Sequence, residues 1–200
     1  FVADTGGWFT GRKVLISPVA NTAEPDWEEK KLRLDLTREM VKDSPDVDLD
    51  KPVSRQNELD MMRHYRWPVY WQGPYPDFSG TIPLEYYEEV SMSETEKGDS
   101  HLRSAKEVEG YNIHAVNGEI GRCVDLIVED QSWKIRYLVV DTGNWLSGRK
   151  VLVSPLWIRN VEWATAEIYS ELSREDIENG PEYDPSRPVN RDYEGELYDY

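Results

Sequence analysis

The sequence predicts a mainly β protein in which two copies of one small domain follow each other. Two observations lead to this prediction: a block of fifteen residues occurs twice, and short segments of alternating apolar and polar residues are separated by turn signals at regular spacing. Five or six short strands in about 70 residues are typical of a small barrel or sandwich. We therefore expect two tandem β-barrels, each followed by short helices.

The repeated block is the strongest evidence for two copies. Residues 4–18 read DTGGWFTGRKVLISP and residues 141–155 read DTGNWLSGRKVLVSP, with eleven of the fifteen positions identical. Beyond the block the match continues at an offset of 136 instead of 137, so that Trp27 aligns with Trp163. The residues that precede the block in the second copy would have their counterparts before Phe1. We therefore expect the first copy to lack its opening strands.

Each element of the second copy has its own signal in the sequence. Alternating apolar side chains predict strands, and Asn117 followed by Gly118 is a strong hairpin signal. Ser173 opens a capping box that predicts a short helix, and Asn190 can cap a second one. The expected strands are residues 108–117, 121–129, 133–140 and 150–154, with two more within 157–172.

These elements divide the chain into three expected parts. Residues 1–78 form the first copy with a helical and aromatic tail, residues 79–104 a polar linker, and residues 105–200 the second copy. An incomplete first copy would have an open strand edge and an exposed apolar face that includes Val14 and Ile16. Strands from a second chain, preceding residues or the copy's own tail would cover that face, and we favour a homodimer through the first copy.

The order of three segments in the second copy resembles the PRC-barrel family. The segments are GEIGRCVDLIVED, KIRYLVVDTGNWLSGRKVLVSP and WIRNVEW, and the later LSREDIENGPEYDPSRPVNRDYEGELYDY resembles the extension found in bacterial tandem-domain members. The family is named for the cytoplasmic domain of the photosynthetic reaction-centre H subunit. The resemblance implies a small bent β-barrel that serves as a scaffold or docking module. A link to the assembly of photosynthetic or membrane complexes follows from the family name alone.

The sharpest indication of an enzyme is the tripeptide Asp-Thr-Gly, which begins at Asp4 and again at Asp141. Aspartic proteases use two such loops, whose carboxylates share one proton. In those enzymes a Ser or Thr hydroxyl follows the glycine, whereas Gly7 and Asn144 follow here. The tripeptide also forms an ordinary turn. We therefore expect a non-enzymatic protein, with a hydrolytic or small-ligand-binding role for the paired loops as the alternative.

Two groups of residues are candidates for an interaction surface. Basic pairs recur in both copies of the block, where they either pair with nearby carboxylates or recognise a small anionic group. An aromatic, proline-containing run near the end of the first copy is either a protein contact surface or a strap over the barrel. The candidate residues are Arg12, Lys13, Arg149, Lys150, Trp67, Tyr70 and Trp71. The recurring tryptophans, Trp8 with Trp145 and Trp27 with Trp163, are expected in the barrel core.

Composition narrows the classes of partner. The formal net charge of −16 opposes binding to nucleic acid and to anionic lipid, and the apolar runs are shorter than the ~20 residues of a membrane span. The three histidines lack ligand spacing, so neither a metal nor a cofactor is expected. The single cysteine, Cys123, is expected to be a small buried residue in a protein of the reducing cytoplasm. The expected partner is therefore another protein or a second copy of the chain.

Overall fold

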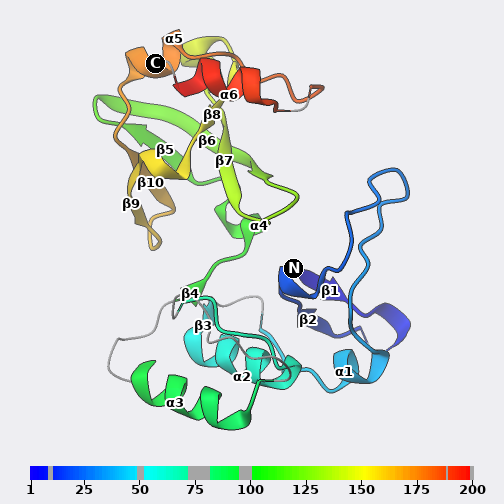
Figure 1. The fold of residues 1–200 in the computed structure, drawn as a ribbon. Helices are drawn as coiled ribbons and strands as arrows, with labels where there is room; N and C mark the ends of the chain where they lie inside the picture. The colour runs from blue at the N-terminus through cyan, green and yellow to red at the C-terminus, as the bar shows by residue number, and fades with distance from the viewer. Residues whose placement is uncertain (9–10, 49–51, 72–81, 95–100, 188, 199–200) are drawn as a thin grey trace. The chain divides into compact units, whose positions relative to one another are not determined.

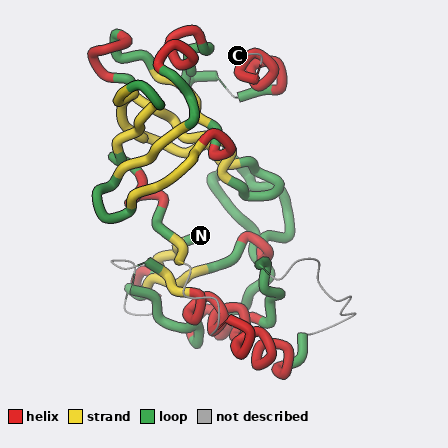
Figure 2. The backbone as a smooth tube through the Cα atoms, turned by 90° about the vertical axis from the view of Figure 1, so that its left-hand side faces the viewer, coloured by secondary structure: helices red, strands yellow, loops and turns green. Residues whose placement is uncertain are grey.

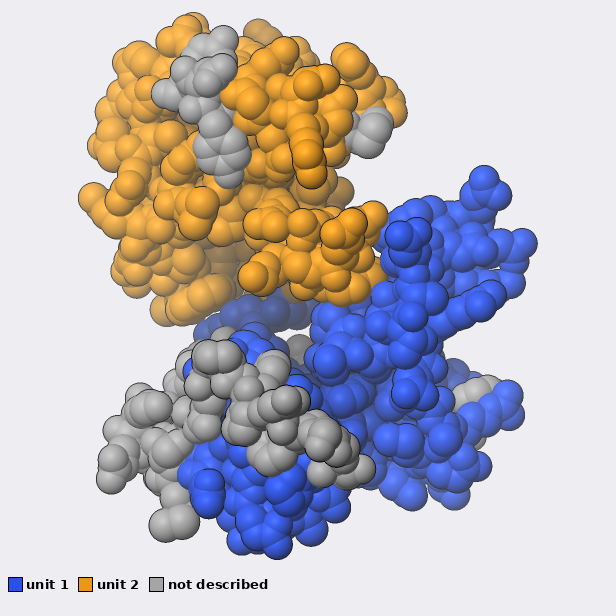
Figure 3. All heavy atoms as spheres, viewed as in Figure 1, with its two compact units in different colours: residues 1–104 blue, residues 105–200 orange. Residues whose placement is uncertain are grey.

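The chain folds as two compact units. The computed structural model describes residues 1–8, 11–48, 52–71, 82–94, 101–187 and 189–198. Unit 1 comprises residues 1–104 and unit 2 residues 105–200, and Figure 3 shows them in different colours. Each unit has its own buried hydrophobic cluster, as separate small domains do.

Unit 2 is built on a six-stranded sheet, so the prediction of a mainly β fold is confirmed there. The strand order is β8-β7-β6-β5-β10-β9, and all neighbouring pairs are antiparallel except β5 and β10, which are parallel. The strands are β5 (Asn112–Ala115), β6 (Gly118–Val128), β7 (Ile135–Asp141), β8 (Lys150–Val153), β9 (Ile158–Glu162) and β10 (Glu167–Ser170). Figure 2 shows that these strands, drawn in yellow, curl instead of lying flat.

Short helices accompany this sheet, and two of them begin where the sequence predicts. The hydroxyl of Ser173 accepts a hydrogen bond from the N–H of Asp176 at 3.1 Å, while Oδ1 of Asn190 accepts one from the N–H of Tyr193 at 2.9 Å. Figure 1 places the two resulting helices, α5 and α6, at the same end of the sheet. The helices of unit 2 are α4 (Ala105–Val108), η3 (Gly143–Leu146), η4 (Pro155–Trp157), α5 (Arg174–Asn179) and α6 (Arg191–Tyr198).

The strands of unit 2 do not close into the expected barrel. Strands β8 and β9 are the two edges of the sheet, and within the described residues no strand joins them. The backbone N–H of Tyr183 donates a hydrogen bond to the carbonyl of Lys150 at 2.8 Å. The segment after α5 therefore occupies part of the β8 edge that β9 would need for closure.

Both faces of the β7–β8 hairpin are buried in unit 2. Val151 and Val153 belong to one cluster, which includes side chains of β5 and β6. Val139 and Leu152 belong to another, together with Leu197 of α6. Because successive strand residues point to opposite faces, α6 covers the face of β8 that is turned away from the β5 and β6 side chains.

Within its described residues, unit 1 contains less sheet than a second barrel requires. Its strands form two separate two-stranded sheets, β1 with β2 and β3 with β4. The elements are β1 (Val2–Asp4), η1 (Gly6–Trp8), β2 (Lys13–Leu15), η2 (Pro18–Ala20), α1 (Arg38–Lys42), β3 (Val53–Ser54), α2 (Arg55–Tyr65), α3 (Leu84–Glu94) and β4 (His101–Leu102). Helices α2 and α3 pack against each other and supply much of its buried surface.

The repeat recurs in the backbone pairing of the two units. Val2 lies opposite Leu15 in unit 1, as Val139 lies opposite Leu152 in unit 2. The β9–β10 hairpin has a counterpart in unit 1, where it is reduced to two isolated bridges. The matching pairs are Asn21–Leu34 with Ile158–Ser170, and Asp26–Lys31 with Glu162–Glu167. The two copies therefore follow the same path over these residues.

The segment expected to be a linker, residues 79–104, instead contributes to the core of unit 1. Tyr87 and Val90 of α3 are buried, and the hydroxyl of Tyr87 donates to the carbonyl of Trp67 at 2.9 Å. Strand β4 pairs with β3. The polar composition of the segment conceals an apolar stripe at helical spacing. Residues 79–81 and 95–100 lie outside the described residues.

The apolar face formed by Val14 and Ile16, at and just after β2, is buried within unit 1. Val14 and Ile16 belong to the core cluster of unit 1, together with Leu59 of α2 and with Trp67. The tail of the first copy, one of the three expected covers, therefore contributes to burying this face. The other face of the β1–β2 sheet is less buried than the equivalent face in unit 2. Val2 of β1 is 49% exposed, whereas its counterpart Val139 of β7 is 1% exposed.

Candidate interaction surface

Arg12, a candidate for anion recognition, holds the end of a helix instead. Its Nη1 donates to the carbonyl of Lys42 at 2.8 Å and its Nη2 to the carbonyl of Ser44, at and just beyond the last turn of α1. Its Nε lies 2.8 Å from a carboxylate oxygen of Asp46. A guanidinium at this place satisfies carbonyls that a helix leaves without partners and complements the helix dipole.

Arg149 makes the corresponding contacts in unit 2. Its Nη1 donates to the carbonyl of Glu178 at 3.0 Å and its Nη2 to the carbonyl of Gly180, just after α5, while its Nε lies 3.9 Å from Glu182. In each copy of the repeat, the arginine therefore acts as a clamp: its guanidinium binds backbone carbonyls at the end of the following helix. Of the adjacent lysines, Lys13 is exposed and Lys150 is half-buried.

The aromatic run of unit 1 packs mainly against α2. Trp67 is buried and its ring stacks on that of Tyr65, with centroids 4.2 Å apart. Trp71 is half-buried, and the guanidinium of Arg55 lies 3.9 Å from its ring centre. Tyr70 is exposed. The described part of this run is therefore chiefly a strap that stabilises unit 1, and Tyr70 is the most exposed of its described aromatic side chains.

Tyr70 of the strap forms a hydrogen bond with the buried carboxylate of Glu58. Glu58 is 1% exposed, and its Oε2 lies 3.0 Å from Nη1 of Arg55. The hydroxyl of Tyr70 donates to Oε1 of Glu58 at 2.8 Å. Burial and this hydrogen bond to a carboxylate raise the pKa of Tyr70. Because the buried carboxylate has these partners, we assign it a structural role.

The two Asp-Thr-Gly sequences form the same local turn. In each, Oδ1 of the aspartate accepts a hydrogen bond of 2.8 Å from the N–H two residues later, and the threonine hydroxyl donates to the carbonyl of the repeat arginine at 2.9 and 2.7 Å. The residues are Asp4, Thr5, Gly6 and Arg12 in unit 1, and Asp141, Thr142, Gly143 and Arg149 in unit 2. The glycines have φ of 55° and 57°, which suits a turn. Each aspartate therefore stabilises the turn of its own unit.

The recurring residues that reach the surface are ones the sequence analysis assigned to the core. Trp27 is 63% exposed and Trp163 is 42% exposed. Each lies at the tip of the corresponding hairpin, beyond the bridge of Asp26 and the end of β9 at Glu162. The sequence offers one signal for this exposure: an acidic residue directly precedes each tryptophan, Asp26 in unit 1 and Glu162 in unit 2, and acidic residues are rarely buried. Trp145 is half-buried in its cluster, and the side chain of Trp8 lies outside the described residues.

A second recurring pair is exposed in the same way. Val19 of η2 is 56% exposed and its counterpart Leu156 of η4 is 81% exposed. In both units the preceding serine hydroxyl accepts from the N–H of this residue, at 3.4 and 3.3 Å. The turn therefore has the same cap and projects an apolar side chain at the same position in both units.

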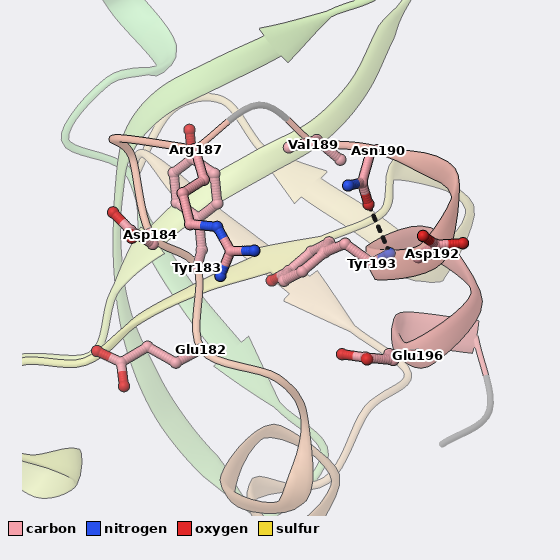
Figure 4. A pocket seen from close by; sticks show the side chains of 9 residues that line it. All are labelled: Glu182, Tyr183, Asp184, Arg187, Val189, Asn190, Asp192, Tyr193 and Glu196. Carbon is pink, nitrogen blue, oxygen red and sulfur yellow. Dashed lines mark hydrogen bonds between the residues drawn. The ribbon is translucent and has the colours of Figure 1, made fainter.

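Unit 2 also has an acidic cavity of about 240 Å³ beside α6 (Figure 4). Figure 4 shows the side chains of Arg187 and Tyr193 directed toward one another. Burial raises the pKa of Tyr193 to about 12, so its hydroxyl stays protonated. The lining residues are Glu182, Tyr183, Asp184, Arg187, Val189, Asn190, Asp192, Tyr193 and Glu196. Among the described residues, there is no group of three or more histidine, cysteine, aspartate or glutamate side chains that could hold a metal ion.

Cys123 is buried, as the sequence predicts, and burial raises its pKa to about 11. A thiol with so high a pKa is protonated at neutral pH and is a poor nucleophile. Within the described part of the chain, no helix is both long and apolar enough to cross a membrane.

Comparison with known proteins finds a relative that matches part of the chain. No protein-family model matches the chain. A stretch of 75 residues, 37% of this chain, is 33% identical to an uncharacterized protein of Deinococcus radiodurans. The aligned stretch covers 27% of that protein, so the chain is similar to about a quarter of its relative's length.

Proposed function

We propose that the chain is a non-enzymatic docking module, made of two units of the PRC type, that binds another protein. The observation that carries this proposal is the repeated exposure of Trp27 and Trp163 at equivalent hairpin tips. Tryptophan is the residue type most enriched among the side chains that dominate binding energy at protein interfaces. A surface tryptophan on one unit alone would carry little weight, but the same exposure in both units favours a shared role.

The second recurring pair adds to this argument. Val19 and Leu156 place an exposed apolar side chain on a capped turn in each unit. Single exposed apolar residues are ordinary on protein surfaces. Two such residues at matching positions, each held by the same serine cap, give each unit a similar set of apolar contacts. A partner that recognises one unit therefore finds similar chemistry on the other.

The charge of the chain favours a basic partner. A formal charge of −16 attracts basic proteins over the distance set by the salt concentration and speeds their encounter with the chain. Two similar contact surfaces on one chain also allow a partner with two sites to bind by avidity, with an affinity above that of either site alone. We therefore propose a basic protein, or a basic repeat, as the partner.

Self-association through unit 1 is the alternative form of docking. It is favoured by Val2, which is 49% exposed where its counterpart in unit 2 is buried, and by β1, which pairs only with β2 among the described strands. Light scattering after size-exclusion chromatography tests it: a mass of twice 23.3 kDa supports self-association, and a mass of 23.3 kDa at all concentrations rules it out.

Site-specific cross-linking tests the docking proposal. A photo-reactive amino acid replaces Trp27 or Trp163 in the full chain, and each variant is irradiated in an extract of the source cells. The proposal expects one identified protein to be cross-linked from both positions. Replacement of Ile135, which is 47% exposed and lies outside the hairpin tips, serves as the control. Different proteins captured from the two tips, or equal capture from position 135, would contradict a shared docking role.

A further inference from the structure

A cavity of about 140 Å³ lies in unit 2 between β8, η4, α5 and α6. Its walls include Val151 and Leu152 of β8, Leu172, Ile177 of α5 and Leu197 of α6. Four of these side chains are buried, and Leu172 is half-buried. The cavity is separate from the acidic one of Figure 4 and from the exposed tryptophan at the hairpin tip. Because Val151 and Leu152 point to opposite faces of the sheet, this apolar space lies along the edge of β8, with α5 and α6 beside it and the exposed Asp176 at its mouth.

The polar groups at its wall have partners elsewhere. The side chain of Asp176 is exposed, and its Oδ2 accepts hydrogen bonds from the N–H and the hydroxyl of Ser173 at 2.7 and 2.8 Å. The N–H of Gly180 donates to the carbonyl of Asp176 at 2.9 Å, and the carbonyl of Gly180 accepts from Arg149. A water molecule in a cavity needs two to four polar partners. These groups are engaged, so the wall favours an apolar guest over water.

The volume sets the size of that guest. An engineered cavity of about 150 Å³ with apolar walls stays dry and binds benzene or xenon. Ordinary ligand pockets occupy about 300–1,000 Å³, so a nucleotide or a larger cofactor does not fit. We propose that this cavity binds one small apolar molecule of the size of a benzene ring, either a single-ring aromatic or a branched hydrocarbon. This site goes beyond the docking proposal and does not depend on it.

Differences between the copies restrict the site to unit 2. Leu197 belongs to the cluster with Leu152, on the face of β8 that α6 covers. Its counterpart Met61 lies on α2, in the cluster with Val14 and Ile16 of the opposite face. The helix that frames the cavity therefore has another position in unit 1. We expect one ligand per chain.

Methyl NMR with benzene as the probe tests the proposal on the full chain. Benzene is expected to shift the methyl signals of Val151, Leu152, Ile177 and Leu197, and to leave those of Val14 and Ile16 unchanged. At ten times its dissociation constant it should raise the folding equilibrium constant of unit 2 about elevenfold. Absence of methyl shifts in a saturated benzene solution would overturn the proposal.

Two filling variants and one control separate the cavity from general solvent effects. Leu172→Phe fills the space and should abolish the benzene shifts, while Leu32→Phe makes the same change at a 40% exposed position of unit 1 and should leave them intact. Val151→Ile is the milder variant if Leu172→Phe fails to fold. Shifts that persist in the filling variants would overturn the proposal.

Discussion

The hydroxyl of Tyr70 donates a hydrogen bond of 2.8 Å to Oε1 of the buried Glu58. At the equivalent glutamate of unit 2, Glu194, the donor is the hydroxyl of Tyr137 on β7, also at 2.8 Å. The two tyrosines come from different parts of the repeat, one from the strap after α2 and the other from a strand. The strap of unit 1 thus supplies a contact that the sheet supplies in unit 2.

Tyr70→Phe should lower the free energy of unfolding of unit 1 by about 1–2 kcal/mol. The change removes a donor to a buried carboxylate, and hydrogen bonds to charged groups contribute about 1.5–3 kcal/mol, less where the donor is exposed. Urea unfolding followed by tryptophan fluorescence measures the effect. Tyr137→Phe is the matched variant and should destabilise unit 2. An unchanged midpoint for Tyr70→Phe would show that the strap is not held by this contact.

Arg149→Ala should destabilise unit 2 by about 1–3 kcal/mol, since it leaves two helix-end carbonyls without their donor. Arg149→Lys should restore little of this loss, because an ammonium group lacks the planar fork that reaches both carbonyls. Arg12→Ala and Arg12→Lys should behave in the same way in unit 1. Thermal unfolding measures all four variants. Full recovery of stability in the lysine variants would show that the positive charge, and not the geometry of the guanidinium, stabilises the helix end.

Gly121→Ala should disrupt the pairing of β6 with β7. A Cβ at Gly121 would lie 2.0 Å from the carbonyl oxygen of Asp141, and backbone cannot yield as a flexible side chain does. We expect a loss of about 3 kcal/mol or more, at the upper end of overpacking effects. Gly7→Ala is the control, because nothing lies within 4 Å of a Cβ there. Equal stability of the two variants by circular dichroism melting would contradict this close approach.

Unit 2 should lose stability in acid through the cap of α5. Hydrogen bonds from the backbone and hydroxyl of Ser173 lower the pKa of Asp176 below its usual value near 4. Because the folded pKa is the lower one, the contribution is present above the unfolded value and disappears as pH falls through the folded value. Asp176→Asn should therefore flatten part of the fall in stability below about pH 4. Identical pH profiles of the variant and the parent chain would contradict this role.

The repeat allowed much of the local structure to be predicted. The Asp-Thr-Gly turn, the paired strands that flank it and the caps at Ser173 and Asn190 depend on neighbours in the sequence, and all are present. Local hydrogen bonds of this kind need no knowledge of distant residues. The same holds for the burial of Cys123 within an alternating strand.

The positions of distant segments could not be predicted in this way. Alternation shows which face of β2 is apolar, but it does not show that α2 and the strap would bury Val14 and Ile16. Nor does it show that Tyr183 would bond to the edge of β8 and keep the sheet open. The exposure of Trp27 and Trp163 differs from the prediction, because recurrence does not distinguish a core residue from a surface residue. Recurrence shows that a residue has the same role in both copies, and that role can lie on the surface.

Binding of the cross-linked partner to the variant that carries both Trp27→Ala and Trp163→Ala tests the docking account most directly. Isothermal titration of the purified partner compares this variant with the parent chain and with each single variant. The account predicts a loss of about tenfold or more for each single variant and a larger loss for the double variant, as expected for two interface tryptophans. Binding of the double variant with the affinity of the parent chain, in a protein that remains folded, would contradict the account.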